Sequence, residues 1–405
     1  MQYDLVFEGG GAKGMVFVGA LQELERRGHT FGRFLGTSAG AIMATFAAAG
    51  LTVGEMVAAL NEKDDHGVPI FQQFLGEPRP FTRPEIDASV TRQALQAIDL
   101  PGVPGNVEAY IDRIVLYLMT RQEFAHVFSF VERGGWFSAD AFVTWARAKL
   151  DQATPTGQAR DLSRQTFAEF NRSTGRELSL VAADTTAGRM LVLNHRTAPL
   201  VPVVWGMRMS MSLPLIWQEV IWQPEWGDYM GTPVVGHRIV DGGLLSNFPI
   251  ELFLSSDPHV TALMGHRTSQ GVLGLLIDES LPVGNDEARS VPPPSTGTEL
   301  VKLPPAARIR GLIDTATQAH DKLVIDAFEQ FVCRLPARGY GTTEFDMSDV
   351  RREALVAAGQ RAAEAYFTQI ETEGMKGPDV FAMERALRRA DQSAVRILQG
   401  AGTRE

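Results

Sequence analysis

The chain has 405 residues, of which 44% are hydrophobic, so it is long enough to bury the core of one large domain or two smaller ones. Its net charge of -10 argues against nucleic acid as the main partner, because neutralising phosphates requires a basic surface. The only cysteine, Cys333, excludes an internal disulfide and a cysteine-based zinc site, and its apolar neighbours predict a small buried side chain.

The N-terminal residues predict the cellular location. They include two acids, Asp4 and Glu8, and no basic segment, so they do not resemble a signal peptide. The longest nearly apolar stretch, residues 39–51, is too short to span a bilayer. We therefore expect a cytoplasmic protein, and its negative charge predicts no bulk electrostatic attraction to anionic membranes.

The first fifty residues predict the opening of an α/β sheet. Residues 3–8 predict a short buried strand, and residues 15–27 predict a helix with one apolar face. A second strand is expected at 31–35, followed by an apolar helix at 39–49. This alternation is typical of a sheet with helices on both faces.

Residues 62–135 differ in composition from the residues before them, because prolines interrupt short helical stretches and phenylalanines are frequent. We interpret this segment as a helical insertion over the sheet. It is either a lid or lipid-facing cap, or an ordinary packed helical subdomain.

The rest of the chain alternates between strands and helices. The elements expected, in chain order, are a hairpin of strands at 178–183 and 189–194, a helix at 204–211, a strand at 237–240, a buried central strand at 271–277, an exposed loop at 281–298, helices at 305–330, 348–371 and 380–398, and a short strand pair at 331–335 and 342–345.

A glycine-rich run follows the first predicted strand. Gly9, Gly11 and Gly14 match the spacing of a dinucleotide-binding loop, but such a site needs an acidic residue about twenty positions later, and residues 30–50 contain none. A P-loop is excluded as well, because Lys13 is followed by glycine instead of serine or threonine. The remaining interpretation is an oxyanion hole, in which converging amides and a helix N-terminus hold a negative charge.

The candidate oxyanion residues are Gly9, Gly10, Gly11, Ala12, Lys13, Gly14 and, in the next turn, Ala39. Lys13 either adds charge to this site or is a solvated or structural lysine.

Ser38 lies at the centre of a Gly-x-Ser-x-Gly motif between a predicted strand and a predicted helix. Such a turn imposes strained dihedral angles on the serine, so its neighbours must be small. Gly36, Gly40 and Ala39 meet this requirement. We therefore predict that Ser38 is a nucleophile.

A serine nucleophile needs a base, and none of the eight histidines lies in a convincing context. Asp241 is the better candidate, because it ends a predicted strand where α/β sheets place their sites. Gly242 and Gly243 allow a sharp turn that presents its carboxylate, although a turn of this composition is also common without any chemistry. The sequence contains no metal-ligand cluster, so no metal is expected.

Together, the glycine run 9–14, the serine turn 36–40 and Asp241-Gly242-Gly243 resemble the patatin-like phospholipases. The segments 210–214 and 247–249 also fit that family, and the resemblance covers roughly residues 3–370. It implies a three-layer α/β/α fold with a mainly parallel central sheet, a helical insertion and a helical C-terminal tail. The domain boundaries expected are an acyl hydrolase domain at 1–375, containing the insertion at 62–135, and an extension at 376–405.

The resemblance also implies a catalytic Ser–Asp dyad without histidine, here Ser38 and Asp241. The implied activity is hydrolysis of fatty-acyl esters of glycerophospholipids through an acyl-enzyme, without a cofactor. A carboxylate is a weak base for a hydroxyl, so the dyad is expected to need a dry site that raises the pKa of Asp241.

The expected partners are a phospholipid or another acyl-ester lipid and, transiently, a membrane surface. The aromatic-rich residues 216–226 either line an acyl groove, touch a bilayer or pack in the core. Alternative functions are a signalling effector gated by a small-molecule activator, an acyltransferase that uses the same dyad, and a non-catalytic lipid binder.

Overall fold

The computed structural model describes residues 1–97, 105–284 and 328–373 except 343, together with five positions between 388 and 398. The predicted loop at 281–298 and the helices at 305–330 and 380–398 lie largely outside the described residues, as does the extension at 376–405.

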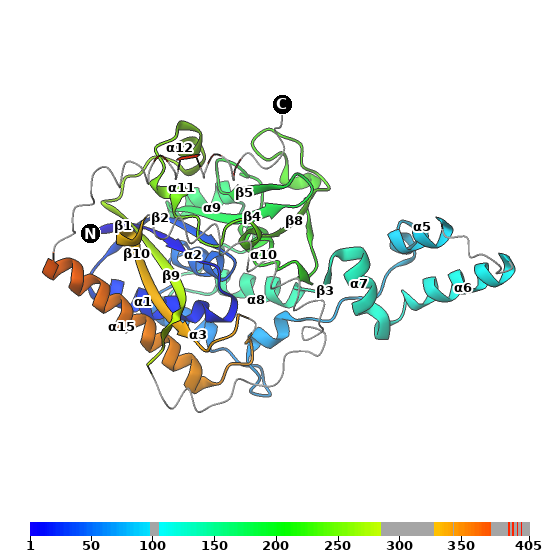
Figure 1. Cartoon of the computed structure of the whole chain (residues 1–405), viewed down its shortest axis with the longest axis horizontal. Helices are drawn as coiled ribbons and strands as arrows, with labels where there is room; N and C mark the ends of the chain where they lie inside the picture. Colours follow the sequence, from blue (N-terminus) through cyan, green and yellow to red (C-terminus); the bar gives the residue numbers. More distant parts are fainter. Residues whose placement is uncertain are drawn as a thin grey trace.

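A mostly parallel sheet forms the centre of the protein (Figure 1). Among the described residues its eight strands are β1 (Gln2–Phe7), β2 (Thr30–Thr37), β4 (Glu177–Asp184), β5 (Arg189–Leu193), β7 (Val220–Ile221), β8 (Arg238–Asp241), β9 (Gly271–Pro282) and β10 (Val332–Arg338). The order is β10-β9-β1-β2-β4-β8-β7, and β5 pairs with β4. The first five strands of this order run parallel, whereas β5 and β8 are antiparallel to β4 and β7 is antiparallel to β8.

Both faces of the sheet are buried, because successive side chains of a strand point to opposite faces. In β1, Leu5 and Phe7 belong to one hydrophobic core, and Val6 belongs to the other. The helices over the first face are α1 (Val16–Arg26), α2 (Ala39–Ala48), α3 (Val53–Leu60), α8 (Asp140–Asp151), α9 (Phe167–Thr174), α10 (Val203–Ser210) and α15 (Asp349–Glu373). The opposite face is covered by α11 (Glu251–Leu254) and α12 (Pro258–Met264). The predicted three-layer α/β/α fold is confirmed.

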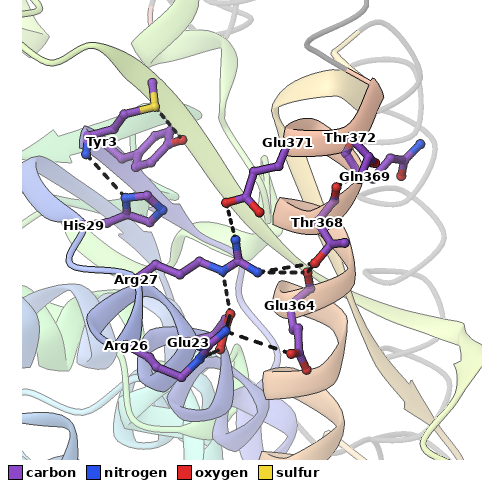
Figure 2. Close-up of polar contacts among 11 residues, drawn as sticks. Tyr3, Glu23, Arg26, Arg27, His29, Glu364, Thr368, Gln369, Glu371 and Thr372 are labelled. Carbon is purple, nitrogen blue, oxygen red and sulfur yellow. Dashed lines mark hydrogen bonds and ion pairs between the residues drawn. The ribbon is translucent and has the colours of Figure 1, made fainter.

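Two helices far apart in the sequence, α1 and α15, pack directly against each other (Figure 1). Polar contacts also join them (Figure 2). The buried carboxylate of Glu23 accepts hydrogen bonds from Arg26 and Arg27 at 2.5–2.6 Å, and Arg27 also donates to Glu371 at 2.5 Å. The C-terminal part of the described fold is thereby fixed to its first helix.

The predicted insertion is helical where the structure describes it. Its helices are η2 (Ile70–Phe74), α4 (Arg83–Asp87), α5 (Val90–Ala97), α6 (Gly105–Leu118) and α7 (Ala125–Arg133). Figure 1 shows α5 and α6 projecting from the body as an arm. Phe81, Ile86, Met119 and Phe128 form a small core of their own, separate from the two cores of the sheet.

The structure corrects one predicted pairing. Residues 342–345 do not form a strand in their described part, and β10 pairs with β9 instead. Gly339, at φ 85°, follows the end of β10, and the Glu344 side chain accepts the N–H of Gly341 at 3.0 Å, which closes a turn there. A second small sheet, β3 (Gly135–Phe137) with β6 (Leu215–Trp217), was not predicted.

Candidate active site

The two candidate catalytic residues lie at the ends of two strands that meet along one edge of β4. β2 is parallel to β4 and its last residue, Thr37, pairs with Val181. β8 is antiparallel to β4 and its last residue, Asp241, pairs with the next residue, Ala182. Since β5 occupies the other edge of β4, the carboxyl ends of β2 and β8 converge. Ser38 follows Thr37 directly, so the register brings it beside Asp241.

Ser38 forms the turn between β2 and α2 in a strained conformation, with φ 54° and ψ -122°. A non-glycine residue adopts such angles only when its surroundings enforce them. Here the N–H of Ser38 donates to Ser210 Oγ at 3.0 Å, and that hydroxyl donates to the carbonyl of Val181 at 2.6 Å. The orientation of Ser38 is therefore fixed by α10 and β4.

The flanking glycines allow the turn to pack against the sheet. A Cβ on Gly36 would lie 2.3 Å from the carbonyl oxygen of Gly40, and a Cβ on Gly40 would lie 2.3 Å from that of Phe7. Real Cβ atoms do not approach backbone so closely, so the start of α2 reaches the end of β1 only because these positions have no side chain.

Asp241 is completely buried and is held on one side only. Its Oδ1 accepts the N–H of Gly243 at 2.8 Å. Its Oδ2 has no hydrogen-bond partner among the described residues. Burial raises the pKa of Asp241 to about 7, while the nearby Ser38 hydroxyl and the Gly243 amide act in the opposite direction. The carboxyl thus has a near-neutral pKa, and its Oδ2 accepts no hydrogen bond from a described residue although the Ser38 hydroxyl is close by.

The glycine run contains both occupied and free amides. The N–H groups of Gly9, Ala12 and Lys13 donate to the carbonyls of Asn247, Thr342 and Gly10 at 2.9–3.2 Å. Within the described part of the chain, the N–H groups of Gly10, Gly11 and Ala39 have no acceptor. The free donors of the predicted oxyanion set are therefore Gly10, Gly11 and Ala39.

Other members of the predicted set have structural contacts. Gly14 lies against Ala39, where a Cβ on the glycine would be 3.0 Å from that of the alanine. The buried Lys13 forms an ion pair with Glu279 on β9, so its ammonium group has a structural contact. Gly242 packs on β4, where a Cβ would lie 2.6 Å from the carbonyl oxygen of Val181.

Asn247 links the glycine run to the aspartate turn, and its role was not predicted. Its Nδ2 donates to the carbonyl of Gly9 at 2.6 Å. A Cβ on Gly9 would lie 2.1 Å from Asn247 Oδ1 and 3.1 Å from the Cβ of Ser38. Ser210, the acceptor for the Ser38 amide, was also missed. Both residues lie inside the segments 210–214 and 247–249 that carry the family resemblance, which was the signal available.

An apolar pocket of about 680 Å³, including its open mouth, adjoins Ser38, Gly11 and Ala39. Its apolar lining includes Ile42, Met43, Phe71, Phe74, Met211, Trp217 and Phe345. The indole N–H of Trp217 donates to the carbonyl of Phe74 at 2.7 Å, and its ring lies 5.8 Å from that of Phe345. These contacts fix a wall of the pocket.

The aromatic segment 216–226 divides between pocket and core. Trp217 lines the pocket, Trp222 and Trp226 are buried in the core, and Ile221 is exposed. The described residues contain no cluster of His, Cys, Asp or Glu arranged to hold a metal ion. Nor is any described helix both long enough and apolar enough to cross a bilayer.

Comparisons with known proteins identify relatives along most of the chain. An uncharacterized protein, YqhO, of Bacillus subtilis is 26% identical over 376 residues, which cover 91% of this chain and 99% of that protein. An uncharacterized NTE family protein of Mycobacterium tuberculosis, MT2641, is 41% identical over 73 residues, which cover 16% of this chain and only 12% of that protein.

Among solved structures, VipD from Legionella pneumophila is 16% identical with a TM-score of 0.46, covering 91% of this chain and 67% of that one. ExoU, solved with SpcU from the type III secretion system of Pseudomonas aeruginosa, is 16% identical with a TM-score of 0.34, and this chain spans 60% of its length. The family model for patatin-like phospholipases matches residues 5–254, more than half of the chain and a range that includes both Ser38 and Asp241. The chain therefore belongs to the patatin-like phospholipase family, a membership that implies an ester hydrolase.

Proposed function

We propose that this chain is a lipid acyl hydrolase that cleaves fatty-acyl esters of glycerophospholipids with a Ser38–Asp241 dyad. The observation that carries the proposal is the unpartnered Oδ2 of a completely buried Asp241, next to a serine held in a strained turn. An unpaired buried carboxyl oxygen costs free energy, which favours a functional reason for keeping it.

In the proposed reaction, Asp241 accepts the proton of the Ser38 hydroxyl as the serine oxygen attacks the ester carbonyl carbon. As the carbonyl oxygen becomes negatively charged, it accepts hydrogen bonds from the free amides of Gly10 and Gly11 in the glycine run and of Ala39 at the start of α2. One such donor contributes about 3–4 kcal/mol to transition-state stabilisation. Collapse of the intermediate breaks the ester bond, and the alcohol leaves with the proton from Asp241.

Hydrolysis of the acyl-enzyme completes the cycle. Asp241 takes a proton from a water molecule whose oxygen attacks the acyl carbon. As this second intermediate collapses, the bond between the acyl carbon and Ser38 Oγ breaks, Asp241 returns the proton to Oγ, and the fatty acid is released. A pKa of about 7 suits these steps, because the carboxyl can both accept and return a proton near neutral pH.

The pocket supports a fatty acyl chain as the part of the substrate that is recognised. Its lining is almost entirely aliphatic or aromatic, which suits an apolar chain. The one acidic side chain that lines it, Glu344, is paired with Arg351 at 2.6 Å. An acyl chain in the pocket would also exclude water from Asp241 and keep its pKa high.

The test is release of free fatty acid from phosphatidylcholine vesicles by the wild type, Ser38→Ala and Asp241→Asn. Each substitution is expected to lower the rate by about a thousandfold or more, because either removes a covalent or proton-transfer partner. Ser163→Ala is the control, since Ser163 is 5% exposed and Ser38 is 7% exposed.

Full activity in Ser38→Ala or Asp241→Asn would exclude the dyad. Acyl transfer to added glycerol that exceeds hydrolysis would replace the proposal with an acyltransferase.

A further inference from the structure

One helix of the arm has an uncovered apolar face. Five large hydrophobic side chains of α6 are 40–62% exposed, namely Val107, Tyr110, Ile111, Ile114 and Tyr117. The last four follow Val107 by three, four, seven and ten positions, which places all five on one side of the helix. We call these five residues the α6 stripe. Soluble surfaces rarely leave such a continuous apolar stripe in contact with water.

The arm, taken with α4 and α7 at its base as residues 79–133, differs from the rest of the chain in charge. Residues 79–133 contain six arginines, no lysine and seven acidic residues, so they contribute about -1 to a total charge of -10. The arm can therefore approach a neutral or anionic surface without the repulsion that the body would experience. Two tyrosines in the α6 stripe add rings that suit the boundary between acyl chains and headgroups.

The arm leaves the body at the wall of the acyl pocket. Phe74 lines the pocket and accepts the indole N–H of Trp217 at 2.7 Å. Two residues later, the carbonyl of Gly76 accepts the N–H of Ser138 at 2.9 Å, which joins the two chain segments at the root of the arm. The arm therefore begins beside the pocket.

We propose that the α6 stripe docks on the surface of a phospholipid bilayer and brings the pocket to its lipid substrate. The partner is a lipid surface and not a second copy of the chain, because the arm is nearly neutral, carries tyrosines in the stripe and begins beside a pocket suited to acyl chains. Attachment through apolar side chains of a nearly neutral arm implies that binding depends little on anionic lipid or salt. The role of the contact rests on the proposed phospholipase function, whereas the contact itself does not.

The test is flotation of the full chain with phosphatidylcholine vesicles. The variant is Ile111→Asp with Ile114→Asp, which puts two charges in the middle of the α6 stripe. Its bound fraction is expected to fall at least tenfold. The matched control is Val235→Asp with Val350→Asp, at positions on the body that are 52% and 45% exposed. It should bind within twofold of the wild type.

Hydrolysis of p-nitrophenyl butyrate, a water-soluble ester, provides the second measurement. The α6 variant should keep the wild-type rate on this ester, which also shows that it is folded, and should lose activity on vesicles. If the wild type cleaves neither substrate but still binds vesicles through α6, the proposed function fails and the docking surface stands.

Three results would overturn the proposal. One is equal vesicle binding by the wild type and the α6 variant. Another is binding only to vesicles with anionic lipid, abolished by salt. The third is a wild-type dimer that the α6 substitutions dissociate while vesicle binding persists, which would make the stripe an interface between copies.

Discussion

At the scale of single residues, Asp241 couples the proposed chemistry to the stability of the fold. Its ordinary pKa is 3.8, and burial raises it to about 7. Between these two values the unfolded chain releases the proton while the folded protein retains it. Because the folded state then binds more protons, stability falls as the pH rises from about 4 to about 7, and is constant above that range.

Asp241→Asn should therefore stabilise the protein in a pH-dependent way. The gain is expected to be near zero at pH 4 and to approach about 4 kcal/mol above pH 7, which is the upper limit set by a shift of about three pKa units. Urea unfolding at pH 4, 6 and 8 measures it. Asp65→Asn, at an exposed position, is the control for the change from carboxyl to amide. A pH-independent effect of Asp241→Asn would refute the raised pKa.

At the scale of elements, α1 and α15 cross at backbone contact. A Cβ on Gly19 of α1 would lie 1.8 Å from the carbonyl oxygen of Val356, and a Cβ on Gly359 of α15 would lie 2.1 Å from that of Val16. The two glycines face each other's helix, so neither helix can accept a side chain there without moving away. The polar contacts in Figure 2 lie further along the same pair of helices.

Gly359→Ala is expected to destabilise the protein by about 1–3 kcal/mol, because the added methyl group forces the helices apart. Without the close crossing, replacing glycine by alanine would stabilise the helix by about 1 kcal/mol. A loss of stability therefore indicates that the two helices contact each other at Gly359. Gly54→Ala in α3 is the control, since its nearest contact would be 3.9 Å away, and it should stabilise the protein. Thermal unfolding distinguishes the two. Stabilisation by both substitutions would contradict the close crossing.

The local elements around the candidate site could be predicted from the sequence because their signals are local. The strand before Ser38, the apolar helix after it and the strand that ends at Asp241 each follow from residue periodicity. The motifs in turn indicated the family. The free amides could not be separated from the occupied ones, because the acceptors for Gly9 and Ala12 are Asn247 and Thr342, which lie far away in the sequence.

Long-range pairing explains the other differences. The strand at 331–335 was expected to pair with residues 342–345, but β9 provides a longer parallel edge for β10. The sheet of β3 and β6 joins residues about eighty positions apart, and a pairing of this kind leaves no local pattern. The domain boundaries at 375 and around the insertion stay predictions.

At the scale of the whole molecule, the arm and the body differ in how much apolar surface holds them together. The arm has four buried side chains in its own core, and α5 has none, whereas the two sheet cores run through every main strand. Local opening requires little free energy where few apolar contacts must be broken.

Hydrogen exchange should report this difference. Backbone amides of α5 and α6 are expected to exchange at least a hundredfold faster than those of β1, β9 and α1, as measured by mass spectrometry on peptides from each element. Phosphatidylcholine vesicles should slow exchange in α6 and leave β1 unchanged. Uniform exchange over arm and body would show that the arm is part of one cooperative unit.

The convergence of β2 and β8 along β4 also determines when, during synthesis, the protein can become reactive. Ser38, the glycine run and β4 have left the ribosome long before Asp241, which lies about 200 residues after the serine. An incomplete chain thus has the serine turn and the proposed oxyanion amides but lacks the proposed base. Only the insertion of β8 beside β4 completes the pair, so under the proposed function a chain that ends before Asp241 would not cleave esters.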